Sequence, residues 1–202
     1  MQKTLPKKKA NSCKKRQDRL YLKGRTYKEY QEYLALHPDA FVVPMDTVYN
    51  DETNGPFIQT FKFLDAGVLL ALYREQKTAQ AMKEGVDLLE SALGEEVFRK
   101  YVHILLTDRG TEFSAADAME TDVDGNRRTR VFYCDPMQSG QKGSLENKHV
   151  ELRYILPKAT DLKGLGLVDQ EALNLAVSHV DSAPVEKLGG QEPSRCGKLH
   201  VS

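Results

Sequence analysis

Three strand-like segments that follow one another closely constrain the fold more than any other feature of this sequence. Residues 41–49, 57–63 and 68–74 are rich in apolar, aromatic and β-branched side chains, and the segments 50–56 and 65–67 between them carry turn residues. Connections this short join antiparallel neighbours, because a parallel pair needs a crossover of about a dozen residues or more. The sequence therefore predicts an antiparallel meander.

Cap residues and apolar spacing place helices before and after this meander. Thr26 with Glu29 forms a capping-box pattern, and Thr78 and Gly94 bound a segment whose apolar residues recur every three or four positions. Similar patterns predict strands over 102–107 and 129–134 and helices over 113–119, 144–156 and 169–180. The order βββαβαβα, followed by a further helix, predicts an α/β fold with a mixed five-stranded sheet flanked by helices on both faces.

Charge divides the chain into a basic arm and an acidic body. The 202 residues have no net charge, but residues 1–28 hold 11 of the 29 Lys and Arg residues and 1 of the 29 Asp and Glu residues. Such an arm favours contact with a polyanion through counterion release, although a solvated, disordered tail has the same composition. We expect an arm over 1–25, one domain over 26–192 and a divergent tail over 193–202.

Composition argues against several classes of protein. The three cysteines, Cys13, Cys134 and Cys196, are far apart and form no C-x-x-C pair, which argues against a zinc site or a disulfide framework. No apolar run is long enough to cross a bilayer, and the N-terminus lacks the apolar core of a signal peptide. We therefore expect a cytoplasmic protein with free thiols and no membrane partner.

Two aspartates occupy positions where a carboxylate needs an explanation. Asp46 interrupts an apolar strand, and burying a carboxylate is costly unless a cation or a donor meets it. Asp108 directly follows the strand over 102–107, at the end where open sheets place their ligands. If the first and fourth strands are neighbours, the two carboxylates can converge. A structural ion pair for Asp46 and a turn or cap for Asp108 are the alternatives.

A third acid lies on the predicted helix over 144–156. At helical spacing Glu146, His149 and Arg153 share one polar face, which is also what an ordinary solvated helix presents. If this helix packs at the same edge of the sheet, Glu146 can join the two aspartates. Three carboxylates without a histidine cluster suit Mg²⁺ or Mn²⁺, and a pair of such ions supports in-line displacement at phosphorus.

Several motifs in order resemble the integrase catalytic core of insertion-sequence transposases of the IS-thirty group. The motifs cover 45–47, 106–113, 132–136, 141–149 and 153–158, and the resemblance spans about residues 24 to 192. It implies a ribonuclease-H-like fold whose Asp-Asp-Glu triad binds two divalent metal ions, Mg²⁺ or Mn²⁺. Such enzymes cut transposon ends and join them to target DNA, and they work as multimers, so a homo-oligomer on DNA and a nucleoid association are expected.

The resemblance also assigns individual residues. Asp46, Asp108 and Glu146 match the triad, as catalytic residues and metal ligands. Arg153 matches a basic position that is expected to contact a DNA phosphate. The other matches, which are expected to contact DNA, are Arg109, Gln141, Lys142, Asn147, His149 and Lys158. Glu112 and Asp135 also fall within the motifs but are not assigned as ligands.

Three features depart from the family pattern. There is no room for the helix-turn-helix region that normally reads the terminal repeats. Pro44 lies in a predicted central strand, where proline removes a ladder donor, and 194–202 lacks the expected apolar helical ending. These departures suggest a truncated or decaying copy. They leave two alternatives open: a non-catalytic DNA-binding fragment that acts by co-assembly, and a ribonuclease-H-like nuclease of another purpose.

Overall fold

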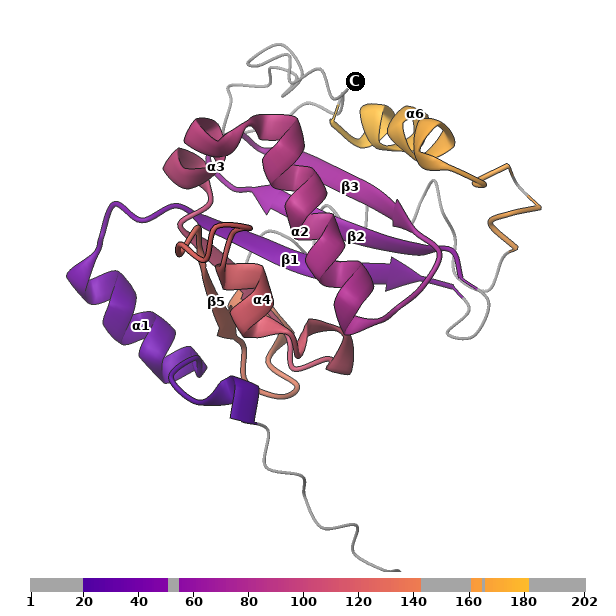
Figure 1. The fold of residues 1–202 in the computed structure, drawn as a ribbon. Coiled ribbons are helices and arrows are strands. Elements are labelled where there is room, and N and C mark those ends of the chain that lie inside the picture. The colour runs from indigo at the N-terminus through magenta and orange to yellow at the C-terminus, as the bar shows by residue number, and fades with distance from the viewer. Residues whose placement is uncertain (1–19, 51–54, 143–160, 165, 182–202) are drawn as a thin grey trace, which may run out of the picture.

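A mixed five-stranded sheet forms the centre of the molecule (Figure 1). The computed structural model describes residues 20–50, 55–142, 161–164 and 166–181. The strands are β1 (Val42–Tyr49), β2 (Phe57–Phe63), β3 (Val68–Arg74), β4 (Ile104–Thr107) and β5 (Arg130–Tyr133), in the spatial order β3-β2-β1-β4-β5. β1, β2 and β3 pair antiparallel, whereas β1, β4 and β5 pair parallel. The predicted meander and the mixed five-stranded sheet are confirmed.

Helices cover both faces of this sheet. The α-helices are α1 (Tyr27–Leu36), α2 (Ala79–Leu93), α3 (Glu95–Tyr101), α4 (Ala116–Glu120) and α6 (Gln170–Asp181). Short 3₁₀ helices are η1 (Leu20–Leu22), η2 (Thr111–Phe113) and η3 (Ser139–Lys142). α2 crosses one face of the sheet (Figure 1). Within the described ranges, no helix has the length and hydropathy needed to cross a bilayer.

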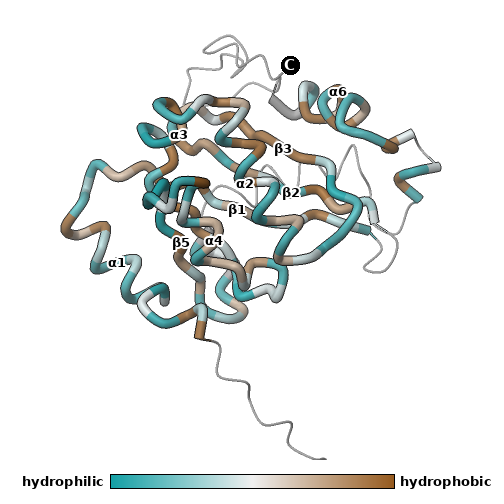
Figure 2. The backbone as a smooth tube through the Cα atoms, in the orientation of Figure 1, coloured by the Kyte–Doolittle hydropathy of each residue, from teal (hydrophilic) through white to brown (hydrophobic). Residues whose placement is uncertain are grey.

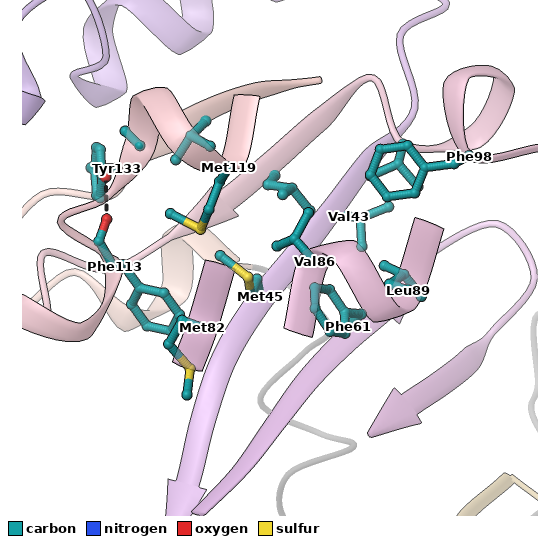
Figure 3. Packing of buried hydrophobic residues seen from close by; sticks show 14 of the residues in the cluster. Val43, Met45, Phe61, Met82, Val86, Leu89, Phe98, Phe113, Met119 and Tyr133 are labelled. Carbon is teal, nitrogen blue, oxygen red and sulfur yellow. Dashed lines mark hydrogen bonds between the residues drawn. The ribbon is translucent and has the colours of Figure 1, made fainter. Parts of the chain in front are cut away.

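The largest core lies between α2 and the sheet. Side chains of β1, β2, β4 and β5 alternate, so that every second residue points toward α2. Figure 3 shows how these side chains meet those of α2, α3, η2 and α4; among them Val43, Met45, Phe61, Met82, Val86, Leu89, Phe98, Phe113, Met119 and Tyr133 are buried. Each large apolar side chain buried here contributes roughly 1.5–3 kcal/mol. The apolar spacing of 79–93 is thus explained by this contact.

Two smaller clusters cover the opposite face. α1 packs its tyrosines and Leu34 on Ile104, Leu106 and Phe132 of β4 and β5. α6 packs Leu173 and Val177 on the meander strands. Figure 2 accordingly shows hydrophobic residues concentrated in the sheet, whereas α1 is mostly hydrophilic along its length. The tyrosines of α1 therefore serve packing.

The helix caps lie where the sequence placed them. Thr26 and Glu29 form the capping box of α1, and Thr78 accepts a hydrogen bond from Ala81 N–H at the start of α2. Gly94 ends α2 with a φ of 80°. The predicted helix over 169–180 is observed as α6, shifted by one residue at each end.

Three details differ from the sequence prediction. Residues 95–101 form α3, which the sequence did not predict, because Gly94 ends one helix and begins the next. β4 starts at Ile104 rather than at residue 102, since Val102 N–H still caps α3 by donating to Phe98 O. The predicted helix over 113–119 is divided into η2 and α4. The helix predicted over 144–156 lies outside the described residues.

The strand β1 runs through Pro44 without interruption. Ile104 N–H donates to Phe41 O at 3.1 Å, so odd-numbered residues of this segment turn their backbone polar groups toward β4 and even-numbered ones toward β2. The missing donor of Pro44 therefore faces β2, whose pairing with β1 begins one residue later, at Met45. On the other side Pro44 pairs with Leu106. The proline is thus accommodated in this strand.

Residues 20–25, which the charge pattern assigns to the arm, are packed on the body. Tyr21 and Leu22 contact the core between α2 and the sheet, and the Tyr21 ring meets Tyr133 edge-on at 5.2 Å between centroids. Arg25 O accepts a hydrogen bond from Tyr133 N–H at 2.9 Å. The packed part of the described chain therefore begins before residue 26.

Candidate active site

The pairing of β1 with β4 brings two aspartates to neighbouring positions on the central strands of the sheet. The last registered pair joins Pro44 and Leu106, and Asp46 and Asp108 each follow two residues later. Extended by two residues, this register places Asp46, within β1, level with Asp108, which directly follows β4, on neighbouring strands ~4.8 Å apart. The condition that the sequence set, that the first and fourth strands be neighbours, is met.

Backbone N–H groups fix one oxygen of each carboxylate. Asp46 Oδ1 accepts a hydrogen bond from Thr47 N–H at 2.8 Å, and Asp108 Oδ1 accepts one from Gly110 N–H at 2.8 Å. Both side chains are half-buried. These bonds hold the two carboxylates in defined orientations by the local turn of the chain, without an arginine in either of these two contacts.

Gly110 allows a third acid to approach Asp108. A Cβ atom built on Gly110 would lie 2.5 Å from Glu112 Oε2 and 2.9 Å from Asp108 Oδ1. The two carboxylates therefore occupy the space that any side chain at position 110 would need. Glu112 is 8% exposed. Glu112 belongs to the motif after β4, but no local pattern predicts that its carboxylate folds back toward Asp108.

Lys77 supplies a cation next to this acidic group. Its Nζ lies 3.3 Å from Glu112 Oε1 and 4.1 Å from the centroid of the Tyr49 ring. Burial of Lys77 opposes its charged form, but Tyr49 and Glu112 outweigh this effect and raise the pKa of its ammonium group. Sequence reasoning missed Lys77, because it lies in the link between β3 and α2 and belongs to no motif.

Two of the predicted DNA contacts take part in a local network. Arg109 donates from Nε to Cys134 O at 3.0 Å and from Nη2 to Asp135 Oδ1 at 2.8 Å. Gln141 Oε1 accepts from Asp135 N–H at 2.7 Å. Arg109 therefore ties the loop after β4 to the loop after β5, and Gln141 holds the second loop together. A contact of either residue with DNA stays a prediction.

The remaining predicted site residues are not placed. Lys142 ends η3, but its side chain lies outside the description. Outside the described residues lie Glu146, Asn147, His149, Arg153 and Lys158. The third member of the predicted triad is therefore untested, together with most of the predicted DNA contacts.

The donors at this site fit a hard divalent cation. Asp46 and Asp108 offer oxygen ligands on adjacent strands, which is the chemistry that Mg²⁺ and Mn²⁺ prefer. Over the part of the chain that the structure describes, no group of three or more His, Cys, Asp or Glu residues is arranged to hold a metal ion. Glu112 is paired with Lys77, so a complete site requires a further ligand such as Glu146.

Comparison with known proteins identifies a partial relative. No protein-family model matches the chain. The transposase for insertion sequence element IS1086 of Cupriavidus metallidurans is 32% identical over 89 residues, which are 44% of this chain. The match covers 24% of the length of that transposase.

Solved structures of integrases share the fold. The catalytic core domain of BIV integrase has a TM-score of 0.53 and 18% identity, covering 78% of this chain and 93% of that domain. The HTLV-2 integrase catalytic core domain in complex with magnesium has a TM-score of 0.53 and 15% identity, covering 77% and 94%. A chain of the simian T-cell lymphotropic virus intasome has a TM-score of 0.58 and 15% identity, covering 80% and 54%.

The fold is that of an integrase catalytic core. The predicted ribonuclease-H-like architecture is thereby confirmed. The sequence relative and the structural neighbours agree on the class of transposases and integrases. Membership in the IS-thirty group and the Asp-Asp-Glu triad stay predictions.

Proposed function

We propose that this chain is a transposase catalytic core that cleaves DNA and transfers a strand with the help of divalent metal ions. One observation carries the proposal: Asp46, within β1, and Asp108, directly after β4, lie at the same level of two neighbouring parallel strands, in a sheet with the fold of integrase cores. The partial similarity to an insertion-sequence transposase supports the same conclusion. The IS-thirty group is the proposed subfamily.

In this proposal Asp46, Asp108 and Glu146 hold the metal. A bound pair of Mg²⁺ or Mn²⁺ ions supplies the activation of a water or a 3′-hydroxyl and the stabilisation of the leaving oxygen. The chain itself keeps Asp46 and Asp108 oriented through the N–H groups of Thr47 and Gly110. Positioning of this kind is the part of catalysis that a fixed scaffold contributes.

Lys77 and Glu112 have a supporting role in the proposed site. Glu112 adds a third negative charge next to Asp108, and like charges repel strongly when partly buried. Lys77 balances that charge and is itself held over Tyr49. We infer that this pair stabilises the conformation of the loop after β4 and thereby keeps Asp108 in place. Neither residue is proposed as a ligand.

The proposed partner is DNA, both the transposon ends and the target. Basic residues that match the family motif, Arg109, Lys142, Arg153 and Lys158, supply the expected phosphate contacts. The neighbours include a chain of an intasome complex and an integrase core described in a trimeric form. We therefore propose that the chain assembles as a homo-oligomer on DNA, in the cytoplasm and associated with the nucleoid.

The decisive experiment removes one charge of the acid pair. The full chain is incubated with Mg²⁺ and a plasmid that carries the chromosomal DNA on both sides of its gene, and nicked and joined products are measured. We expect Asp108→Asn to abolish both products. Asp65→Asn, in the exposed turn between β2 and β3, is the matched control and should leave them unchanged. Activity retained by Asp108→Asn would rule out the proposed site.

The two alternatives predict other outcomes of the same assay. A non-catalytic fragment, which the charge of residues 1–28 favours, would bind DNA in a salt-sensitive way without metal and yield no product. That binding would be lost when residues 1–28 are removed. A ribonuclease-H-like nuclease of another purpose would instead cleave the RNA of an RNA–DNA hybrid and give no joined product.

A further inference from the structure

A basic cavity lies at the open edge of the sheet, away from the acid pair. Its volume is about 200 Å³, and it is formed where residues 23–25 run beside β5. The charged residues that line it are Lys23, Arg25, Arg127, Arg130 and Glu120. Four cations therefore face one carboxylate, and the exposed Asp117, which pairs with Arg25 at the rim, adds only a second. The cavity keeps a positive charge.

Arg25 is the structural anchor of this cavity. Its Nε donates to Glu120 Oε1 at 3.1 Å and its Nη2 to Glu120 Oε2 at 2.9 Å, a bidentate pair in which both partners are largely buried. Arg25 O also accepts the N–H of Tyr133, the last residue of β5. Glu120 is thus mostly neutralised by Arg25, and the charge of the other cations is available for a ligand.

The other three cations are held less tightly. Among the described residues, no carboxylate lies within ion-pair distance of Lys23 or Arg130, and the guanidinium of Arg130 stacks over the Tyr33 ring at 4.8 Å. Arg127 lies 3.6 Å from Glu120 Oε2 with 54% of its side chain exposed. A guanidinium that stacks on an aromatic ring, as Arg130 does, keeps its N–H groups available for a phosphate.

We propose that this cavity binds phosphates of a DNA backbone, as a second DNA contact outside the acid pair. The proposal rests on the proposed function for the identity of the polyanion. A long polyanion fits better than a small anion, because residues 1–19, which directly precede the cavity-forming segment, carry eight further Lys and Arg residues and one Asp. One ligand can then neutralise both the arm and the cavity.

The position of the cavity fits a DNA path that leaves the acid pair. Ile104 pairs with Arg130, so Arg130 stands one strand across from β4 and four residues before the level of Asp108. At ~3.3 Å per residue the separation along the strands is roughly 13 Å. That distance corresponds to about four base pairs of B-DNA at ~3.4 Å each. A duplex engaged at Asp108 can therefore reach the cavity without bending.

The test removes two cations at exposed positions, and Arg127 thereby loses its 3.6 Å contact with Glu120. In the full chain, Lys23→Ala/Arg127→Ala leaves the Arg25–Glu120 pair intact. The control Lys83→Ala/Lys163→Ala removes the same charge from α2 and from the turn before α6. Binding of a fluorescent DNA duplex is measured by anisotropy without metal, over a series of KCl concentrations. The slope of log K against log[salt] is negative, and each lost phosphate contact should reduce its magnitude by about 0.9.

For Lys23→Ala/Arg127→Ala we expect the magnitude of the slope to fall by about 1.8, and the affinity for the duplex at low salt to be roughly tenfold weaker. The control should keep the wild-type slope. Equal slopes for the two variants would overturn the proposal. If thermal unfolding shows that the double variant is not folded, Lys23→Ala alone, at an exposed position, should lower the slope by about 0.9. An unchanged slope in that variant would likewise overturn it.

Two further arms separate the possible explanations. Potassium phosphate at the same ionic strength as KCl should not displace the duplex; specific displacement from wild type but not from the double variant would indicate a small-anion site and overturn the proposal. Asp108→Asn should bind with the wild-type slope. If wild type binds DNA through the cavity but makes no joined product, the proposed function is contradicted and this inference stands. If wild type joins DNA and Lys23→Ala/Arg127→Ala binds it as wild type does, this inference is contradicted and the proposed function stands.

Discussion

Two groups of carboxylates in the described part of this protein are held in different ways. Asp87, Glu90 and Glu120, on α2 and α4, are engaged by the guanidinium groups of Arg128 and Arg25. Asp46, within β1, and Asp108, directly after β4, each accept a backbone N–H from a residue one or two positions later. An arginine neutralises the acid that it binds, whereas a backbone N–H mainly orients it.

This difference separates acids that join helices to the sheet from acids that can act on a ligand. Arg128, with a side chain 2% exposed, donates to Asp87, to Glu90 and to Met119 O, and so connects α2 with α4. Removing one partner there should therefore affect folding. Removing a charge from the acid pair should affect activity and leave folding intact. The following predictions test this division, from the largest expected effect to the smallest.

Asp46→Asn should abolish strand transfer while the protein stays folded. The asparagine oxygen can still accept the Thr47 N–H, but it lacks the negative charge that a metal ligand needs. We expect a loss of roughly 10⁴-fold or more, or over about 5 kcal/mol of activation free energy. The measurement is the single-turnover rate of joining, with the melting temperature recorded in parallel. Asp39→Asn, at an exposed position after α1, is the control.

A large drop in melting temperature for Asp46→Asn would place this aspartate with the structural acids and contradict the division.

Arg128→Ala should have the opposite profile. It leaves Asp87 and Glu90 without their buried cation, and breaking a buried ion pair costs about 3–5 kcal/mol of unfolding free energy. The measurement is urea unfolding at neutral pH. The matched control is Arg99→Ala, whose pairs with Glu95 and Asp122 lie nearer the surface and should contribute much less to the unfolding free energy. Equal losses for the two variants would contradict the prediction.

Gly110→Ala should lower activity more than stability. The new Cβ would lie 2.5 Å from Glu112 Oε2 and 2.9 Å from Asp108 Oδ1, so both carboxylates must move. A displacement of about 1 Å at a reacting centre can lower the rate by roughly 10²-fold. Joining rates and melting temperatures are measured as before, and Gly140→Ala, where a Cβ meets no atom within 4 Å, is the control. Wild-type activity in Gly110→Ala would show that Asp108 does not need its observed position.

The elements that the sequence predicted depend on local signals, whereas the missed features depend on distant contacts. The caps Thr26, Thr78 and Gly94 act within one turn of their helices, so their residue types suffice. The sequence could predict that Asp46 and Asp108 lie near each other only if the first and fourth strands are neighbours, because no local signal determines which strands pair. α3 was missed because a seven-residue helix has too few turns for a clear period.

The contact between Lys77 and Glu112 shows the same limit at the candidate site. These residues are 35 positions apart, and they meet because the start of α2 packs beside η2. Charge alone also assigned residues 20–25 to the arm, whereas Tyr21 and Leu22 pack against the core and Arg25 pairs with Glu120, 95 positions later in the sequence. Basic residues near a terminus therefore do not by themselves show that a segment is solvated, because they can pair with residues that are distant in the sequence.

The smallest expected effect concerns the pH dependence of the structural acids. Burial raises the pKa of Asp87, but hydrogen bonds from Lys83 and Arg128 outweigh it and lower the pKa below its ordinary value. A carboxyl whose pKa is lower in the folded state stabilises the protein above its unfolded pKa, about 3.9, and that contribution is lost as the pH falls through the folded value. Asp87→Asn removes this contribution.

The difference in unfolding free energy between wild type and Asp87→Asn should therefore be constant from about pH 7 to pH 5 and shrink below about pH 4. Urea unfolding at pH 7, 5 and 3 measures it. Asp117→Asn, whose side chain is 89% exposed, provides the comparison, because an acid at the surface contributes little at any pH. A difference for Asp87→Asn that does not change with pH would mean that its charge does not stabilise the fold. The division would then rest on Arg128 alone.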